Sequence, residues 1–315
     1  MTRMRKDGSI FFEYHRGKGV AELGEYTDLQ KLQEIEMSLL EKLKEICKKY
    51  NLTYFAGCGT LLGAIRHKGF IPWDDDMDLL LPWPDYQKLM EIAPRECSYP
   101  FFFQSIYTEH DAMANASRLR RSDTTGFTRW EYENVGPCYD LGIFIDIFPL
   151  FFVPDSAEER AKQKETVMRA WRCIHGHDAY SQRKRGGYVN KQYESFMPEY
   201  KELCAEKGLS VDNDITWLKE KYLEACVWNE RTKEVGTTSS RCHKPSLMWD
   251  AEWFKSTIEL PFENTTIVCP SEYERILEKS YGDWKTPVVG TSDHEMVAFD
   301  TETPWREFDM SSIKT

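Results

Sequence analysis

One stretch of this sequence constrains the fold more than any other, because a glycine turn, a short helix and an acidic run follow each other within it. It spans residues 57–81 and reads GCGTLLGAIRHKGFIPWDDDMDLLL. Glycine lets the backbone approach a ligand closely, and the start of a helix offers N–H groups to phosphate. We therefore predict a helix over residues 60–67 and a buried strand over residues 76–81. The candidate phosphate-binding residues are Gly57, Gly59, Thr60, Arg66, His67 and Lys68.

The acidic run that follows is the candidate metal site. Side chains alternate along a strand, so Asp74, Asp76 and Asp78 would share one face if the strand extends that far. Carboxylates crowded on one face repel each other unless a cation lies between them, and hard oxygen ligands suit Mg²⁺ or Mn²⁺. Acidic runs are more often solvated loops. Here the run leads directly into three leucines, and burying an unpaired carboxylate is costly, which favours a metal.

The rest of the chain predicts a mixed α/β fold with one compact domain over residues 1–315. Apolar residues spaced by three and four predict a helix over 28–50, with Asp28 as its N-cap. Further strands are expected over 99–107, 115–121 and 139–148, and a helix over 271–281. We expect a motif core over 28–150, a largely helical insertion over about 156–257 and a C-terminal segment over 258–315.

Composition narrows the class of protein and its compartment. The 315 residues are 41% hydrophobic, enough to build a core, and carry a net charge of −11, which disfavours nucleic acid as a partner. The most apolar run, residues 143–153, contains Asp146 and Pro149 and is too short to span a membrane. The chain opens without the apolar run of a secretory signal. Nine cysteines without a CxxC pair indicate a reducing, cytoplasmic location, and peripheral membrane contact stays open.

The stretch GTLLGAIRHKGFIPWDDDMD, residues 59–78, closely resembles the LicD family of phosphocholine transferases, whose relatives include the fukutin-type proteins. Residues 145–150 (IDIFPL), 281–284 (YGDW) and His294 add to the resemblance. It implies a nucleotidyltransferase-like mixed sheet flanked by helices. It also implies that Asp76 and Asp78 form an acid pair on one strand, with a third carboxylate on a neighbouring strand. Asp146, a lone acid in an apolar strand, is the natural third member, and an ion pair with a core arginine such as Arg118 is the alternative.

The resemblance further implies an activity. It implies Mg²⁺-dependent transfer of phosphocholine, or a related phospho-alcohol, from a CDP-alcohol donor to a sugar hydroxyl of a cell-surface glycan precursor, with release of CMP. Such acceptors, of the teichoic acid or lipopolysaccharide type, are commonly lipid-linked. CDP-ribitol or CDP-glycerol as donor, transfer of a nucleoside monophosphate and a non-catalytic binding module are the alternatives. Asp74 or Asp146 would accept the acceptor's proton.

Two further groups of residues are candidates for ligand contacts. Arg118 and Arg120 either bind the nucleotide phosphates or coat a strand edge, and the resemblance slightly favours a functional His294 over an ordinary surface histidine. Choline would give the aromatic residues a role, because aromatic rings hold quaternary ammonium groups through cation–π contacts. The candidates for a choline or sugar site are Trp73, Trp83, Trp130 and Trp249, although any one of them is more often a core residue.

Overall fold

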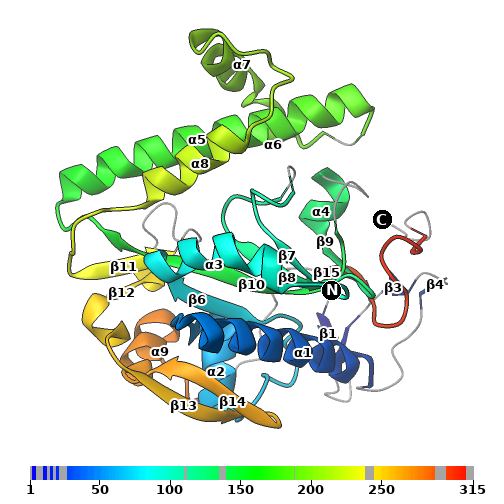
Figure 1. Ribbon diagram of the computed structural model, residues 1–315, viewed down its shortest axis with the longest axis vertical. Coiled ribbons are helices and arrows are strands. Elements are labelled where there is room, and N and C mark those ends of the chain that lie inside the picture. Colours follow the sequence, from blue (N-terminus) through cyan, green and yellow to red (C-terminus); the bar gives the residue numbers. More distant parts are fainter. Residues whose placement is uncertain are drawn as a thin grey trace.

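The computed structural model describes residues 27–109, 112–134, 140–187, 189–237, 245–287 and 296–309, together with four short N-terminal strand segments. They form a mixed α/β fold in which a seven-stranded mixed sheet is flanked by helices (Figure 1). The predicted fold class is therefore confirmed. The N-terminal segments are β1 (Thr2–Met4), β2 (Ile10–Phe12), β3 (His15–Arg16) and β4 (Gly19–Val20).

The sheet is organised around one long strand, β10 (Ile143–Val153), which is buried along almost its whole length. Strand β6 (Asp78–Pro82) pairs parallel with it, whereas β8 (Ser117–Arg121) and β11 (Glu234–Thr237) pair antiparallel with it. The outer strands are β5 (Phe55–Ala56), β7 (Phe101–Gln104) and β12 (Met248–Asp250). A strand buried on both faces needs a nearly continuous apolar sequence, and in β10 Asp146 is the exception.

Helices cover the sheet on both sides, with α1 (Thr27–Tyr50) and α2 (Cys58–Arg66) on one side and α5 (Ala157–Arg185) on the other (Figure 1). The apolar face of α1 packs into the core, where Leu32, Leu39 and Leu43 are fully buried. The predicted helix over 28–50 is confirmed. Because α1 begins at Thr27, however, Asp28 lies inside its first turn, and its assignment as N-cap is wrong.

The region after β10 forms a second apolar core, built mainly from α5, α7 (Met197–Glu206) and α8 (Thr216–Cys226), and the short α6 (Lys191–Glu194) lies in the chain between α5 and α7. Trp83 packs against both cores and joins them. The predicted insertion is helical only as far as Cys226. Beyond it, β11 and β12 return to the main sheet, so the predicted boundary near residue 257 is wrong. Strands of three or four residues are too short to leave a periodic signal.

The remaining helices and strands complete the fold. They are α3 (Trp83–Glu96), β9 (Thr125–Thr128), α4 (Arg129–Asn134), η2 (Pro245–Leu247), η3 (Ala251–Phe254), β13 (Thr257–Phe262), β14 (Thr265–Pro270), α9 (Tyr273–Tyr281) and β15 (Met296–Asp300). Strand β15 pairs antiparallel with β9, so a segment near the C-terminus lies beside α4. Among the helices of the described residues, none is both long and apolar enough to span a lipid bilayer.

Candidate active site

The glycine turn holds the start of β6 in place. The Thr60 hydroxyl accepts a hydrogen bond of 2.8 Å from the Asp78 N–H, and the Gly57 N–H donates to the Asp78 carbonyl at 2.9 Å. Gly59 lies against the acidic run, since a Cβ atom there would come within 2.8 Å of Asp74 Oδ2. The turn and the acids predicted from the sequence thus form one compact site, in which Thr60 positions the strand that carries Asp78.

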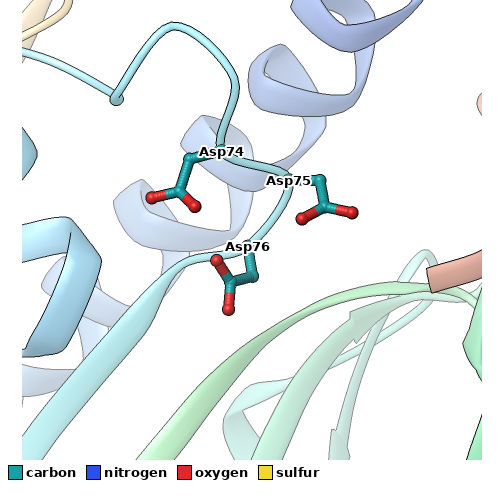
Figure 2. A group of neighbouring side chains, drawn as sticks. All are labelled: Asp74, Asp75 and Asp76. Carbon is teal, nitrogen blue, oxygen red and sulfur yellow. The ribbon is translucent and has the colours of Figure 1, made fainter. Parts of the chain in front are cut away.

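The acids before β6 lie on a loop and not on a strand. Strand β6 begins only at Asp78, so the prediction that Asp74, Asp76 and Asp78 share one strand face is wrong. Carboxylate oxygens of Asp74, Asp75 and Asp76 instead lie within 4.8 Å of one another, grouped around the turn of the chain ahead of β6 (Figure 2). Asp75 is a site residue that the sequence does not predict, because strict alternation along a strand would turn its side chain away.

Asp146 lies directly opposite Asp78 in the parallel register of β6 and β10, and the Asp146 N–H donates to the Met77 carbonyl at 2.9 Å. Both carboxylates are only 8% exposed. Arg118, on the neighbouring strand β8, donates from Nε to Asp146 Oδ1 at 2.7 Å. The third acid therefore stands next to the acid pair, and the ion pair with Arg118 is present as well.

Arg118 and Arg120 form a buried ion network with Glu131, and this network contacts the site through Asp146. Both guanidinium groups bind Glu131 of α4, Arg118 at 2.6 Å, and both lie over the ring of Phe144. Arg120 is fully buried and also donates to Gln104 Oε1 at 2.7 Å. Arg120 has no exposed surface. It therefore neither binds phosphate nor coats a strand edge, and it is part of the buried ion network.

A further carboxylate, which the sequence analysis missed, faces the cluster from α1. Glu36 is fully buried, and neither of its oxygens has a hydrogen-bond partner. One turn earlier, Gln33 donates to the Asp74 carbonyl at 3.0 Å, so this face of α1 looks onto the acidic loop. An acid at position 36, within the apolar stripe that contains Leu32 and Leu39, was the signal that could have revealed it.

The acids of the cluster raise one another's pKa values. Burial, and then the charge of Asp76, raises the pKa of Asp74 to about 9 and that of Asp75 to about 7. Burial, followed by the charges of Asp76 and Asp146, raises the pKa of Asp78 well above its ordinary value. Burial and the charge of Asp76 do the same for Glu36. Carboxylates in this state fit a hard divalent cation, which would neutralise them and use their oxygens as ligands.

The basic triplet predicted to hold phosphate lies at the other end of α2. Arg66 donates to the Trp284 carbonyl at 3.0 Å, and Lys68 is exposed. The ring of His67 meets that of Trp73 edge-on at 6.4 Å, and burial lowers the pKa of His67. Trp73 immediately precedes the acidic loop, so His67 is the member of the triplet with a link to that loop.

The tryptophans predicted to contact choline or sugar lie in different surroundings. Trp249 is 1% exposed and donates to Ser280 Oγ at 2.9 Å, so it is a core residue and its assignment to a ligand site is wrong. Trp83 stacks on Tyr86 between the two cores. Trp130 of α4 lines a cavity against the helical region. His294 lies outside the described residues.

A glycine turn that fixes an acidic strand start, with a further acid opposite on the neighbouring strand, is the arrangement implied for a nucleotidyltransferase-type site. Residues 51–172 match the family described as "LicD/FKTN/FKRP, nucleotidyltransferase domain". The resemblance to the LicD family is thus confirmed for this part of the chain, which contains the turn, the acids and the arginine network.

Individual relatives match a shorter part of the chain. The lipopolysaccharide cholinephosphotransferase LicD of Haemophilus influenzae is 42% identical over 64 residues, which is 20% of this chain and 24% of the relative. Uncharacterized proteins of Rickettsia prowazekii and Rickettsia typhi are each 37% identical over 71 residues, or 22% of this chain and 27% and 23% of theirs. The chain thus matches about a quarter of each relative's length.

Proposed function

We propose that this protein transfers phosphocholine from a CDP-choline-type donor to a sugar hydroxyl of a lipopolysaccharide-like or teichoic acid-like glycan and releases CMP. The observation that carries the proposal is the group of Asp74, Asp75 and Asp76 beside the Gly57–Thr60 turn, followed directly by Asp78 with Asp146 opposite it, within the segment that matches the family. The choice of choline rests on the relative from Haemophilus influenzae, whose name states cholinephosphotransferase activity on lipopolysaccharide.

The proposed reaction exchanges one phosphorus–oxygen bond for another. The acceptor hydroxyl oxygen bonds to the phosphorus that carries choline, and the bond from that phosphorus to the bridging oxygen breaks, so the oxygen leaves with CMP. The hydroxyl proton passes to Asp74 or Asp146. Such a transfer depends on holding the acceptor in line and on neutralising charge on the diphosphate.

We assign the metal to Asp76, Asp78 and Asp146, with Asp74 and Asp75 close enough to take part. Mg²⁺, or Mn²⁺ in its place, would neutralise the diphosphate when it is bound there. The backbone of the turn and His67 would orient the phosphates, and Arg118 would hold Asp146 in position. Gln33 of α1 holds the acidic loop through its hydrogen bond to the Asp74 carbonyl.

We place the reaction at the cytoplasmic side of the membrane, where the protein meets lipid-linked acceptors by peripheral contact. None of the seven cysteines in the described part of the chain forms a disulfide, which fits a reducing compartment.

Transfer of a nucleoside monophosphate is the second candidate, because the matching family is described as a nucleotidyltransferase domain. The two reactions leave different products. Phospho-alcohol transfer from a CDP-alcohol releases CMP, whereas nucleotidyl transfer from a nucleoside triphosphate releases pyrophosphate.

The test is a panel with purified protein and Mg²⁺, with and without a chelator. It combines CDP-choline, CDP-ribitol, CDP-glycerol or CTP with acceptors that range from free hexoses to lipopolysaccharide. We expect chelator-sensitive CMP release that is fastest with CDP-choline. Pyrophosphate release from CTP, with no CMP from any CDP-alcohol, would overturn the proposal in favour of the second candidate.

A further inference from the structure

A cavity of about 180 Å³ lies where α4 and the loop of residues 112–115 meet the helical region, outside the acidic cluster. One face of α5 supplies Trp171, His175 and Asp178, which follow each other at helical spacing and therefore point the same way. The other walls come from three elements and one loop. The cavity is lined by Ala112, Met113, Ala114, Asn115, Trp130, Trp171, Ile174, His175, Asp178, Tyr193, Lys219 and Tyr222.

The aromatic walls of this cavity meet around one imidazole. The ring of Tyr193 stacks on His175 at 4.1 Å, and Trp171 meets it edge-on at 4.4 Å. Trp130 approaches the same ring at 6.4 Å. Three of these four rings are indole or phenol. Their faces attract cations, and indole attracts them most strongly.

The cavity also contains a carboxylate that stays ionised. Asp178 is 18% exposed and accepts from His175 Nδ1 at 3.0 Å. Although burial acts in the opposite direction, the hydrogen bond from His175 and the proximity of His177, 3.8 Å away, hold the pKa of Asp178 far below its ordinary value. An ionised carboxylate beside aromatic faces is suited to an organic cation.

A positive group belongs to the same lining. Lys219 of α8 is 3% exposed, and its ammonium donates to the Ala112 carbonyl at 2.7 Å. A ligand with only a positive charge would meet this ammonium as a like charge. A ligand in which an ammonium and an anionic group are a few atoms apart matches both Asp178 and Lys219.

We infer that this cavity binds the zwitterionic phosphocholine unit, with its trimethylammonium group between the aromatic walls and Asp178. The inference rests on the proposed function, which supplies a phosphocholine group. Trp130 connects the cavity to the active site through its neighbour Glu131, which binds Arg118, and Arg118 in turn binds Asp146. The helical region would thus select the alcohol, whereas the sheet carries out the transfer.

The binding test compares phosphocholine with its uncharged isostere, in which a tert-butyl group replaces trimethylammonium. Calorimetry on the full chain should give binding of phosphocholine at least about tenfold tighter than that of the isostere. Trp171→Leu and Asp178→Asn should each remove most of this difference. The matched control is Trp217→Leu, which changes a tryptophan of α8 outside the cavity lining and should leave the difference intact.

Equal binding of the two probes, or no binding of phosphocholine to the wild-type protein, would overturn the inference. So would a difference that survives both Trp171→Leu and Asp178→Asn. The CMP assay separates this result from the proposed function. CMP release from CDP-choline without selective phosphocholine binding contradicts the cavity assignment alone. Selective binding that depends on Trp171, without CMP release from any CDP-alcohol, contradicts the transferase alone.

Discussion

The acidic cluster and Asp178 have surroundings that shift their carboxyl pKa values in opposite directions. In the acidic cluster, burial and then the charges of neighbouring aspartates raise the pKa values of Asp74, Asp75 and Asp78. In the cavity of the helical region, Asp178 is hydrogen-bonded by His175 and lies near His177, and its pKa falls. The cluster therefore takes up protons unless a cation neutralises it, whereas Asp178 remains ionised with the groups that the chain provides.

This difference assigns separate tasks to the two regions. A site whose acids lack compensating charge is suited to a metal and a diphosphate. A site with one stabilised carboxylate and aromatic walls is suited to recognising an organic cation. Changes in the acidic cluster should therefore leave the binding of phosphocholine largely intact, and changes in the cavity should leave the binding of Mg²⁺ largely intact.

The largest effect is expected from Asp78→Asn. Loss of one metal-binding carboxylate should lower CMP release from CDP-choline by about 100-fold or more, a loss typical of removing electrostatic stabilisation. Phosphocholine binding by calorimetry should stay unchanged. The control is Asp212→Asn, at a surface aspartate that binds Lys184, and it should keep full activity. Loss of both properties in Asp78→Asn would show that the two regions do not act separately.

Arg118→Met should have the largest effect on folding. It leaves Asp146 and Glu131 buried without their shared guanidinium, which should lower the free energy of unfolding by about 3–5 kcal/mol. Denaturant titration measures this loss. On the same strand, Arg121 pairs with the more exposed Asp123, so Arg121→Met should cost no more than about 1 kcal/mol. Equal costs would contradict the buried network.

Stability without metal should depend on pH through the cluster. The raised pKa values of Asp74 and Asp75 mean that the folded, metal-free protein binds protons that the unfolded chain has released. The free energy of unfolding should therefore fall as pH rises from about 4 towards 9. In the presence of chelator, Tm should drop over this range by at least about 3 °C, and added Mg²⁺ should restore it. A Tm that is independent of Mg²⁺ at high pH would count against the metal site.

The smallest effect is expected from Glu36→Gln. The amide removes a buried acid whose raised pKa destabilises the folded state increasingly as pH rises. Thermal unfolding with chelator should therefore show a higher Tm than wild type, with a larger gain at about pH 8 than at about pH 5. Glu34→Gln on the exposed side of α1 is the control and should give no such trend. A lower Tm at both pH values would contradict the account of Glu36.

Much of the motif core could be predicted from the sequence. The spacing of apolar residues predicted α1, and the family resemblance implied that Asp146 lies on the strand beside Asp78, as it does. The positions that escaped prediction depend on tertiary contacts. Asp75 joins the cluster because residues 74–77 curve as a loop, and a sequence of four acids around one methionine does not distinguish a loop from a strand.

The helical region was harder to predict. Its helices were expected, but the cavity combines residues from α4, α5, α6 and α8, whose packing no local pattern encodes. Trp130 and Trp249 were equivalent candidates by composition, yet one lines the cavity and the other is buried in the core.

The most direct test of the central claim is a calorimetric titration of Mg²⁺ into chelator-treated protein at neutral pH, with Asp78→Asn and Asp178→Asn in parallel. The account predicts saturable binding to the wild-type protein, loss of that binding in Asp78→Asn and unchanged binding in Asp178→Asn. Absence of Mg²⁺ binding in the wild type, or equal binding in Asp78→Asn, would contradict it.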